Sequence, residues 1–195
     1  MNGLSQFGAA PNLLTLMRLF LIPFLVIAIL DGHLHWAFVL FLVAGLSDAL
    51  DGLLARLLKQ HTRLGQYLDP IADKMLLSTL FVVFTHVGVI PRYVTVLVFS
   101  RDVGILLIST LLYVTNTLRD FRPSLFGKLN TLTQILAVIV VMCGLVFGTA
   151  QLADVRVWLL RAITVLAPLS AAQYAWIVVR RVQSQEEAAQ KQAAT

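Results

Sequence analysis

Four aspartates stand close together in a chain that is otherwise mostly apolar. Residues 47–74 read SDALDGLLARLLKQHTRLGQYLDPIADK and contain Asp48, Asp51, Asp69 and Asp73, four of the ten acidic residues. Unpaired carboxylates are costly beside a bilayer, so such a cluster needs protons or cations. Paired oxygen ligands suit Mg²⁺ or Mn²⁺, and two such ions bridged by carboxylates serve phosphoryl transfer. The cluster predicts a two-metal phosphoryl-transfer site; structural salt bridges at a helix end are the alternative.

Small residues are interleaved with the first acidic pair. At about 100° per residue, Asp51 lies about 60° from Asp48 around a helix, and Gly52 and Ala55 fall close to the same face. This face therefore leaves room for a bulky ligand against the backbone. Arg56 stands at its edge. A diphosphate bound there would supply the metal ligands that the carboxylates leave open.

The complete spacing, D-x2-D-G-x2-A-R-x8-G-x3-D-x3-D, resembles the signature of the CDP-alcohol phosphotransferase family. The resemblance implies transfer of a phosphatidyl group from CDP-diacylglycerol to an acceptor hydroxyl, with release of CMP and two Mg²⁺ or Mn²⁺ ions as cofactors. It also implies roles for individual residues. Asp48, Asp51, Asp69 and Asp73 would hold the metals, Asp73 would be the catalytic base, and the CDP-lipid would contact Asp48, Gly52, Ala55, Arg56 and Gly65.

Stretches outside the signature resemble the glycerol-lipid branch of the same family. These are PNLLTLMRLFLIPFLV near the N-terminus, SRDVGILL, and RPSLFGKLNTLTQI. The branch includes phosphatidylglycerophosphate synthases, whose acceptor is glycerol 3-phosphate, and CDP-lipid-using cardiolipin synthases, whose acceptor is phosphatidylglycerol. We expect glycerol 3-phosphate as the acceptor, and phosphatidylglycerol is the alternative. Both acceptors carry a phosphate, so charge alone does not separate them.

Two cations are predicted to bind the acceptor phosphate, Arg101 and Lys128. Arg101 stands within an apolar stretch, where a cation needs an anion. The structural alternative is an ion pair between Arg101 and a neighbouring acid. Asp102 is adjacent in sequence and leaves the helix about 100° away, so it is expected to be a poor partner.

Six apolar stretches approach the ~20 residues that a helix needs to cross a membrane. The chain is 58% hydrophobic and 13% charged, which is too apolar for an ordinary soluble domain. We therefore expect an all-α integral membrane protein with six transmembrane helices, in a CDP-alcohol phosphotransferase-like bundle. Asp69 suits the N-cap and Pro70 the first position of the third helix. The expected helices span roughly 13–30, 36–58, 70–90, 93–118, 125–149 and 155–179.

The predicted domain is a transmembrane catalytic unit over residues 13–181, between a cytoplasmic segment at 1–12 and a polar cytoplasmic tail at 182–195. Lys and Arg concentrate in the loops after the second and fourth expected helices and at the C-terminal end. This predicts that those loops, both termini and the acidic stretch lie in the cytoplasm. The resemblance and the chain's brevity favour the cytoplasmic membrane of a bacterium.

Other functions fit the sequence less well. Basic residues are spread along loops and helix ends, so nucleic acid is not an expected partner. A transporter with an acidic ion site is the alternative from another class, but transport sites usually lie near the midplane and the chain shows no internal repeat. A non-catalytic scaffold would not need Gly52 and Ala55 among the acids. The Gly144-x3-Gly148 spacing is compatible with a homodimer.

Overall fold

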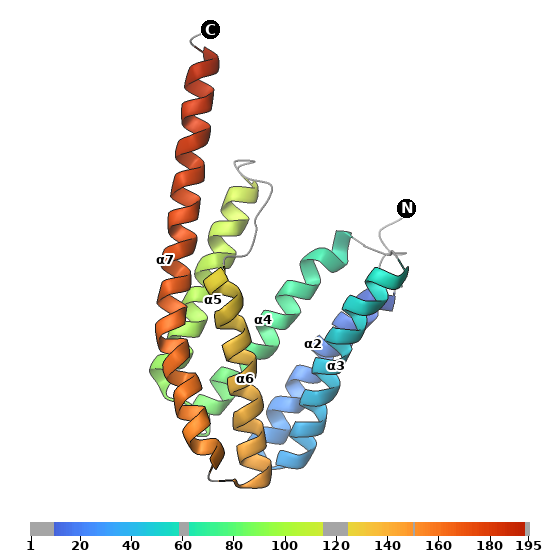
Figure 1. The fold of residues 1–195 in the computed structure, drawn as a ribbon. Coiled ribbons are helices and arrows are strands. Elements are labelled where there is room, and N and C mark those ends of the chain that lie inside the picture. The colour runs from blue at the N-terminus through green and yellow to red at the C-terminus, as the bar shows by residue number, and fades with distance from the viewer. Residues whose placement is uncertain (1–9, 59–62, 115–124, 150, 194–195) are drawn as a thin grey trace. The chain divides into compact units, whose positions relative to one another are not determined.

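The computed structural model describes residues 10–58, 63–114, 125–149 and 151–193. Within these ranges it does not describe the side chains of residues 10–14, 48–58, 63–71, 73, 109–114, 181–182 and 184–193. The described residues form six α-helices and no strand (Figure 1). These are α2 (Ala10–Leu30), α3 (Leu34–Leu58), α4 (Arg63–His86), α5 (Arg92–Val114), α6 (Leu125–Phe147) and α7 (Gln151–Ala193).

The helices agree in number and order with the six apolar stretches, but one predicted boundary is wrong. Helix α4 begins at Arg63, so Asp69 and Pro70 lie inside it rather than at its start. An apolar run marks the part of a helix suited to lipid, while the backbone can stay helical through the polar residues before it. At the other end of the chain, α7 continues from the last apolar stretch through the polar tail to Ala193.

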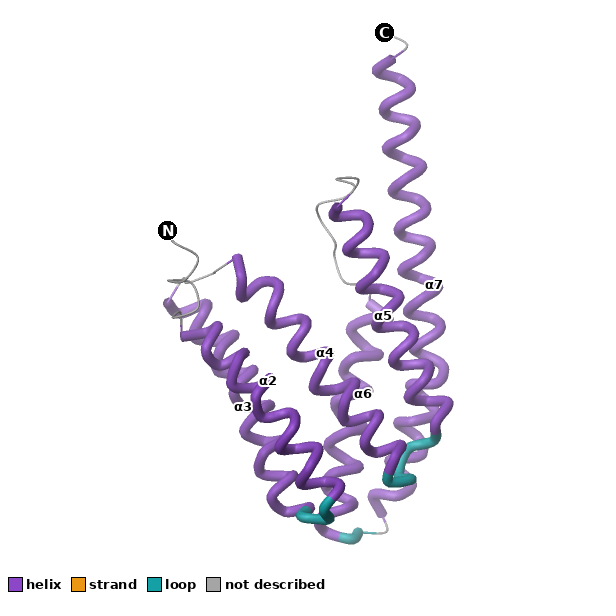
Figure 2. Tube along the Cα trace, turned by 180° about the vertical axis from the view of Figure 1, so that it is seen from behind, coloured by secondary structure: helices purple, strands orange, loops and turns teal. Residues whose placement is uncertain are grey.

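A glycine lies in the turn that follows each of α2, α4 and α6. Loops and turns are coloured teal in Figure 2. Gly32, Gly88 and Gly148 have φ of 75°, 77° and 64°, in the left-handed region that glycine tolerates best. After α2, the amide of Gly32 donates to Ile29 O and the amide of His33 to Ala28 O, at 3.2 and 2.8 Å. This pair of bonds is a Schellman motif, which satisfies carbonyls left open by the helix end. Short, sharply closed turns therefore follow α2, α4 and α6.

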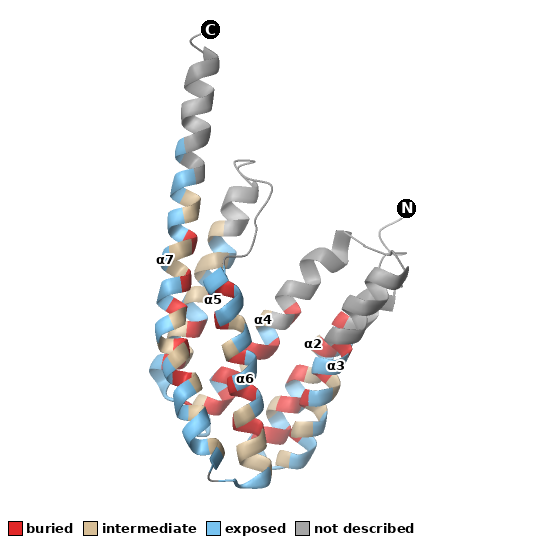
Figure 3. Cartoon of the chain, in the orientation of Figure 1, coloured by how far each residue is buried: buried red, intermediate tan, exposed pale blue. Residues whose placement is uncertain are grey.

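The chain divides into two compact units. Unit 1 comprises Met1–Pro91 and Val138–Arg156, and unit 2 comprises Arg92–Ala137 and Val157–Thr195, so α6 and α7 each contribute to both. In unit 1, α2 packs against α3 and α4. Buried residues form stripes along these helices (Figure 3). Fully buried Ala37 and Ala44 on α3 present small side chains at helical spacing, which allows close helix approach.

Unit 2 contains α5, the first half of α6 and most of α7. The buried face of α7 repeats at intervals of three and four residues, as one side of a helix requires. It comprises Leu160, Ile163, Ala167, Ser170 and Tyr174. On α5, Val94 and Val98 are buried one turn apart, and Asp102 follows after another turn. Both buried stripes therefore change from apolar to polar at Asp102 and Ser170.

Helices of this protein expose apolar side chains and bury several polar ones. Large apolar residues such as Phe20, Phe99 and Val165 are exposed, and Thr15, Arg18, Ser47, Asp102, Asn130, Gln134 and Ser170 are buried. Two helical segments, Leu125–Phe147 and Gln151–Arg180, are long and apolar enough to cross a membrane. Shorter apolar helical segments cover Thr15–Leu30, Leu34–Ser47 and Lys74–His86. Polar residues in membrane helices usually face the bundle interior, so this distribution is typical of a protein in lipid.

Candidate functional site

The signature residues lie on two helices of unit 1. Asp48, Asp51, Gly52, Ala55 and Arg56 belong to the last turns of α3, and Gly65, Asp69 and Asp73 to the first turns of α4. Both helices pack on α2. Each acidic pair thus lies within a single helix, at the spacing of about one turn that places two side chains on one face. Their side chains are outside the described set, so their convergence and individual roles stay predictions.

The donor set suits divalent metal ions. Four carboxylates in two pairs supply the hard oxygen ligands that Mg²⁺ and Mn²⁺ prefer. Asp48, Asp51, Asp69 and Asp73 are therefore the residues that would hold such ions. These four lie outside the described side chains, and among the side chains that the structure describes no group of three or more His, Cys, Asp or Glu residues is placed to bind a metal.

Two further polar residues of unit 1 lie inside α2. Thr15 and Arg18 are both fully buried, and each makes polar or electrostatic contacts. A buried guanidinium needs such contacts, because its charge is otherwise far from water. Neither residue was among the predicted site residues.

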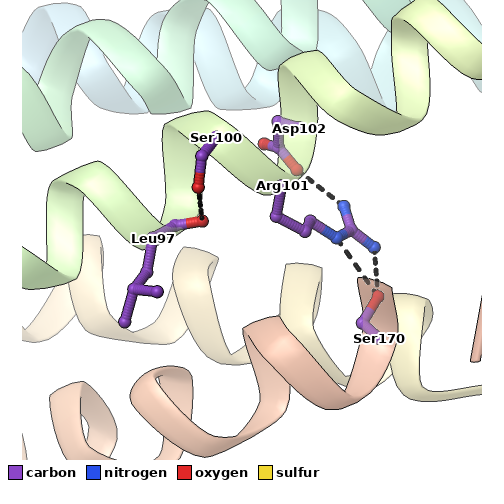
Figure 4. A network of polar contacts seen from close by, with 5 residues as sticks. All are labelled: Leu97, Ser100, Arg101, Asp102 and Ser170. Atoms are coloured by element: carbon purple, nitrogen blue, oxygen red, sulfur yellow. Dashed lines mark hydrogen bonds and ion pairs between the residues drawn. The ribbon is translucent and has the colours of Figure 1, made fainter. Parts of the chain in front are cut away.

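Arg101 on α5 belongs to a polar network in unit 2 (Figure 4). Its Nε and Nη2 donate to Oγ of Ser170 on α7, at 3.1 and 2.7 Å. Its Nη1 lies 2.6 Å from Oδ1 of Asp102, with side-chain exposures of 8% for Arg101 and 4% for Asp102. The pair is therefore almost completely removed from solvent, and it fixes the guanidinium between α5 and α7.

The prediction that Asp102 is a poor partner for Arg101 is wrong. Successive Cα–Cβ bonds do leave the helix about 100° apart, but an arginine side chain has several rotatable bonds and can turn back along its own helix. Ser170 directs it that way, since its hydroxyl accepts two guanidinium hydrogens. Arg101 thus forms the ion pair with a neighbouring acid that was the structural alternative. It also keeps N–H donors that the network does not use, as the predicted acceptor site requires.

Those unused donors can be counted. An arginine has five N–H groups, and the network engages one each on Nε, Nη1 and Nη2. One N–H on each terminal nitrogen is left without a partner among the described residues. Two parallel N–H groups match the bidentate geometry with which Arg binds phosphate. Arg101 is thus oriented, and its binding of an acceptor phosphate through the remaining donors stays a prediction.

Lys128 lies in the first turn of α6 and is exposed. Within the described residues it makes no hydrogen bond or ion pair, so the structure does not join it to Arg101. The α6 N-terminus is tied to α7 instead, because the amide of Phe126 donates to Oε1 of Gln173 at 3.3 Å. The joint acceptor site of Arg101 and Lys128 stays a prediction.

Sequence reasoning missed Ser170 and Gln173 as residues that position this site. Both are uncharged polar residues in the apolar stretch of α7, and that isolation was the available signal. Their partners lie on α5 and α6, 69 and 47 residues away. A pairing over such separations has no local pattern in the sequence.

A cavity of about 210 Å³ lies in unit 1, between the α4–α5 turn, the end of α6 and the start of α7. No predicted site residue lines it. Its walls are mostly apolar, with one cation, Arg156. The lining comprises Val89, Val140, Val141, Gly144, Leu145, Gly148, Thr149, Leu152, Ala153 and Arg156.

Known proteins resemble this chain over most of its length. It is 34% identical over 176 residues to the human cardiolipin synthase (CMP-forming), covering 80% of this chain and 58% of that protein. The probable phosphatidylglycerophosphate synthase of Mycobacterium tuberculosis strain H37Rv is 34% identical over 143 residues, covering 70% of this chain and 66% of that protein.

A third relative is the CDP-diacylglycerol--glycerol-3-phosphate 3-phosphatidyltransferase of Bacillus subtilis strain 168, 31% identical over 66% of this chain and 73% of that protein. The chain spans about three fifths of the length of the mammalian relatives. Residues 9–180 match the model of the CDP-alcohol phosphatidyltransferase family, and this range includes the whole aspartate signature. The chain belongs to the CDP-alcohol phosphatidyltransferase family.

Proposed function

We propose that this protein transfers the phosphatidyl group of CDP-diacylglycerol to a glycerol-type acceptor and releases CMP. The observation that supports this most strongly is the unbroken signature within residues 9–180, with each acidic pair in one helix of the family domain. The proposed acceptor is glycerol 3-phosphate. Phosphatidylglycerol is the second candidate, because relatives named for cardiolipin synthesis match 80% of the chain.

In the proposed reaction, the carboxylate of Asp73 accepts the proton of the attacking primary hydroxyl. The alkoxide oxygen forms a bond to the phosphorus that carries diacylglycerol, and the bond from that phosphorus to the bridging oxygen breaks. The electron pair leaves with CMP. Bound by the four carboxylates, two divalent cations would neutralise the diphosphate and stabilise the leaving phosphate.

The other residues bind and orient the substrates. Gly52 and Ala55 leave space against α3 for the cytidine nucleotide, Arg56 binds its phosphates, and Gly65 on α4 completes the nucleotide site. Arg101, oriented by Asp102 and Ser170, binds the acceptor phosphate. Lys128 adds a second positive charge.

We further infer that all six helices cross the cytoplasmic membrane, with the signature and both termini on the cytoplasmic side. The exposed apolar surfaces of the helices and the two long candidate spans support this arrangement. Lys and Arg enrichment in the loops on the same side as the signature supports the cytoplasmic orientation. CDP-diacylglycerol would then present its cytidine at the cytoplasmic surface while its acyl chains stay in lipid.

The test is a CMP-release assay with purified protein, CDP-diacylglycerol and each acceptor in turn. We expect release only when Mg²⁺ or Mn²⁺ and an acceptor are both present, and complete loss in excess EDTA with recovery on adding metal. Lipid product analysis distinguishes phosphatidylglycerophosphate from cardiolipin. Absence of CMP release with every acceptor, from protein that is folded and metal-supplemented, would refute the proposal.

A further inference from the structure

Two carboxamides lie one turn apart on the buried side of α6. Asn130 and Gln134 are both fully buried, although each stands in a helix whose other buried residues are small or apolar. Residues four apart project from the same face of a helix. The pair therefore forms one polar patch, set among Gly127, Ala137 and Val138.

Neither carboxamide is satisfied by the part of the protein that the structure describes. Five buried side-chain nitrogen or oxygen atoms there lack a hydrogen-bond partner, and four of them are the Nδ2 and Oδ1 of Asn130 and the Nε2 and Oε1 of Gln134. Each amide group offers two donors and an oxygen acceptor. Buried polar groups nearly always have a partner, so the unsatisfied atoms of two adjacent amides are available to a bound ligand or water.

The chemistry of the pair selects the kind of group it binds. A carboxamide is neutral and both donates and accepts, which suits a hydroxyl, whereas the acceptor phosphate is better served by cations such as Arg101. Glycerol 3-phosphate and the head group of phosphatidylglycerol share a secondary hydroxyl next to the primary hydroxyl that would attack. We propose that Asn130 and Gln134 bind this secondary hydroxyl and select acceptors that carry it, an assignment that rests on the proposed function.

The effect of substitution on stability distinguishes a substrate-binding role of the pair from a purely structural one. Amides that only support packing should lower the melting temperature when they are replaced. Amides that stay unsatisfied without substrate should be replaceable by apolar side chains of similar size with no loss of stability, or with a gain. Function and stability then move in opposite directions.

The experiment compares glycerol 3-phosphate with 3-hydroxypropyl phosphate, which lacks the secondary hydroxyl. The variants are Asn130→Leu and Gln134→Met. We expect the wild-type protein to prefer glycerol 3-phosphate at least roughly tenfold in kcat/KM. Each variant should reduce this preference to about twofold or less, at an unchanged or higher Tm and with the KM for CDP-diacylglycerol within about twofold of wild type. If phosphatidylglycerol is the acceptor, phosphatidyl-1,3-propanediol replaces the deoxy analogue.

Thr133→Val is the matched control on the same helix. The Thr133 hydroxyl donates to Leu129 O at 2.8 Å and is already satisfied, so this variant should keep the wild-type preference. Asn130→Gln is the substitute if Asn130→Leu does not fold. It keeps the carboxamide but moves it by one methylene, so it should also lose the preference. If the Asn130 and Gln134 variants retain the wild-type preference, the assignment of the secondary hydroxyl is wrong, but the proposed function is not affected. A wild-type protein inactive with every acceptor would overturn the proposed function as well.

Discussion

At the scale of single residues, Arg101 is oriented before any substrate binds. Ser170 receives two of its N–H groups and Asp102 a third, all at short distances and almost without solvent. A guanidinium held in this way loses little rotamer freedom when an anion binds to its remaining donors. The negative charge of Asp102 partly cancels that of Arg101, so an acceptor phosphate would bind to the remaining donors against the repulsion of this carboxylate.

Arg101→Gln should raise the KM for the acceptor about tenfold to a hundredfold, because hydrogen bonds to charged groups contribute about 1.5–3 kcal/mol. The KM for CDP-diacylglycerol should change little, since only one substrate loses a contact. Steady-state kinetics with each substrate varied in turn measures both constants. The double variant Arg101→Gln with Asp102→Asn removes both charges and controls for the instability of a buried acid that has lost its ion-pair partner. Equal losses for both substrates would assign Arg101 to the architecture alone.

Gly52→Val should abolish binding of CDP-diacylglycerol without unfolding the protein. A β-branched side chain would fill the space proposed for the nucleotide, while glycine itself is about 1 kcal/mol poorer than alanine in a helix. Gly45→Val on the same helix is the matched control, because a Cβ at Gly45 meets no atom within 4 Å. Titration with a cytidine nucleotide, together with a thermal melt, checks both variants. Normal nucleotide affinity in Gly52→Val would show that the ligand does not approach this part of α3.

At the scale of elements, the start of α6 depends on α7. The first amides of a helix have no partner within it, and here the side chain of Gln173 accepts from the amide of Phe126. This contact connects the turn that contains Lys128 to the helix that carries Ser170. The two halves of the predicted acceptor site are thus supported by the same stretch of α7.

Gln173→Ala should loosen the first turn of α6 with a small effect on global stability. The lost hydrogen bond is long, at 3.3 Å, and a typical one contributes about 1 kcal/mol or less in net terms. Hydrogen exchange of the amides of residues 125–129 should accelerate by up to about fivefold, which corresponds to that free energy. Thr164→Val is the control, because its hydroxyl bonds only the preceding turn of α7, at Leu160 O. Unchanged exchange at the start of α6 would show that water replaces Gln173 there.

At the scale of the whole molecule, many large apolar side chains are exposed and several polar ones are buried among the described residues, although most of the buried residues are apolar. Leu107, Phe147 and Trp158 are exposed, whereas Arg18, Asn130 and Gln134 are completely buried. Lipid removes the hydrophobic penalty for the exposed side chains, and helix association then depends on close packing and buried polar contacts. The buried polar residues are therefore candidates both for packing and for the two substrate sites.

The proposed orientation can be tested with single cysteines in a background in which Cys143, the only cysteine, is replaced by alanine. His35→Cys, near the α2–α3 turn, should react with a membrane-impermeant maleimide added to intact cells, because that turn is predicted to face outward. Gln183→Cys, beyond the last apolar stretch of α7, should react only after the membrane is permeabilised. Both positions are exposed in the structure, so reagent access depends on the membrane. The reverse labelling pattern would place the signature on the outer face.

The sequence by itself determined the family, the spacing of the aspartate signature, and the number and order of the six helices that the structure describes. These follow from local information: fixed residue spacing within residues 48–73, and apolar runs long enough to be helices. The start of α4 was predicted wrongly. Hydrophobicity marks the part of a helix suited to lipid, whereas the helical backbone starts earlier, at Arg63.

Among the residues that the structure describes, the tertiary structure decided which polar side chains meet and which lack a partner. Arg101 is joined to Ser170 across 69 residues, and the adjacent Asp102 becomes its partner because α7 turns the guanidinium in that direction. Asn130 and Gln134 look in the sequence like two of several polar residues at the start of an apolar helix. Only burial distinguishes them from exposed Lys128, since helical phase alone does not say which face of α6 is covered.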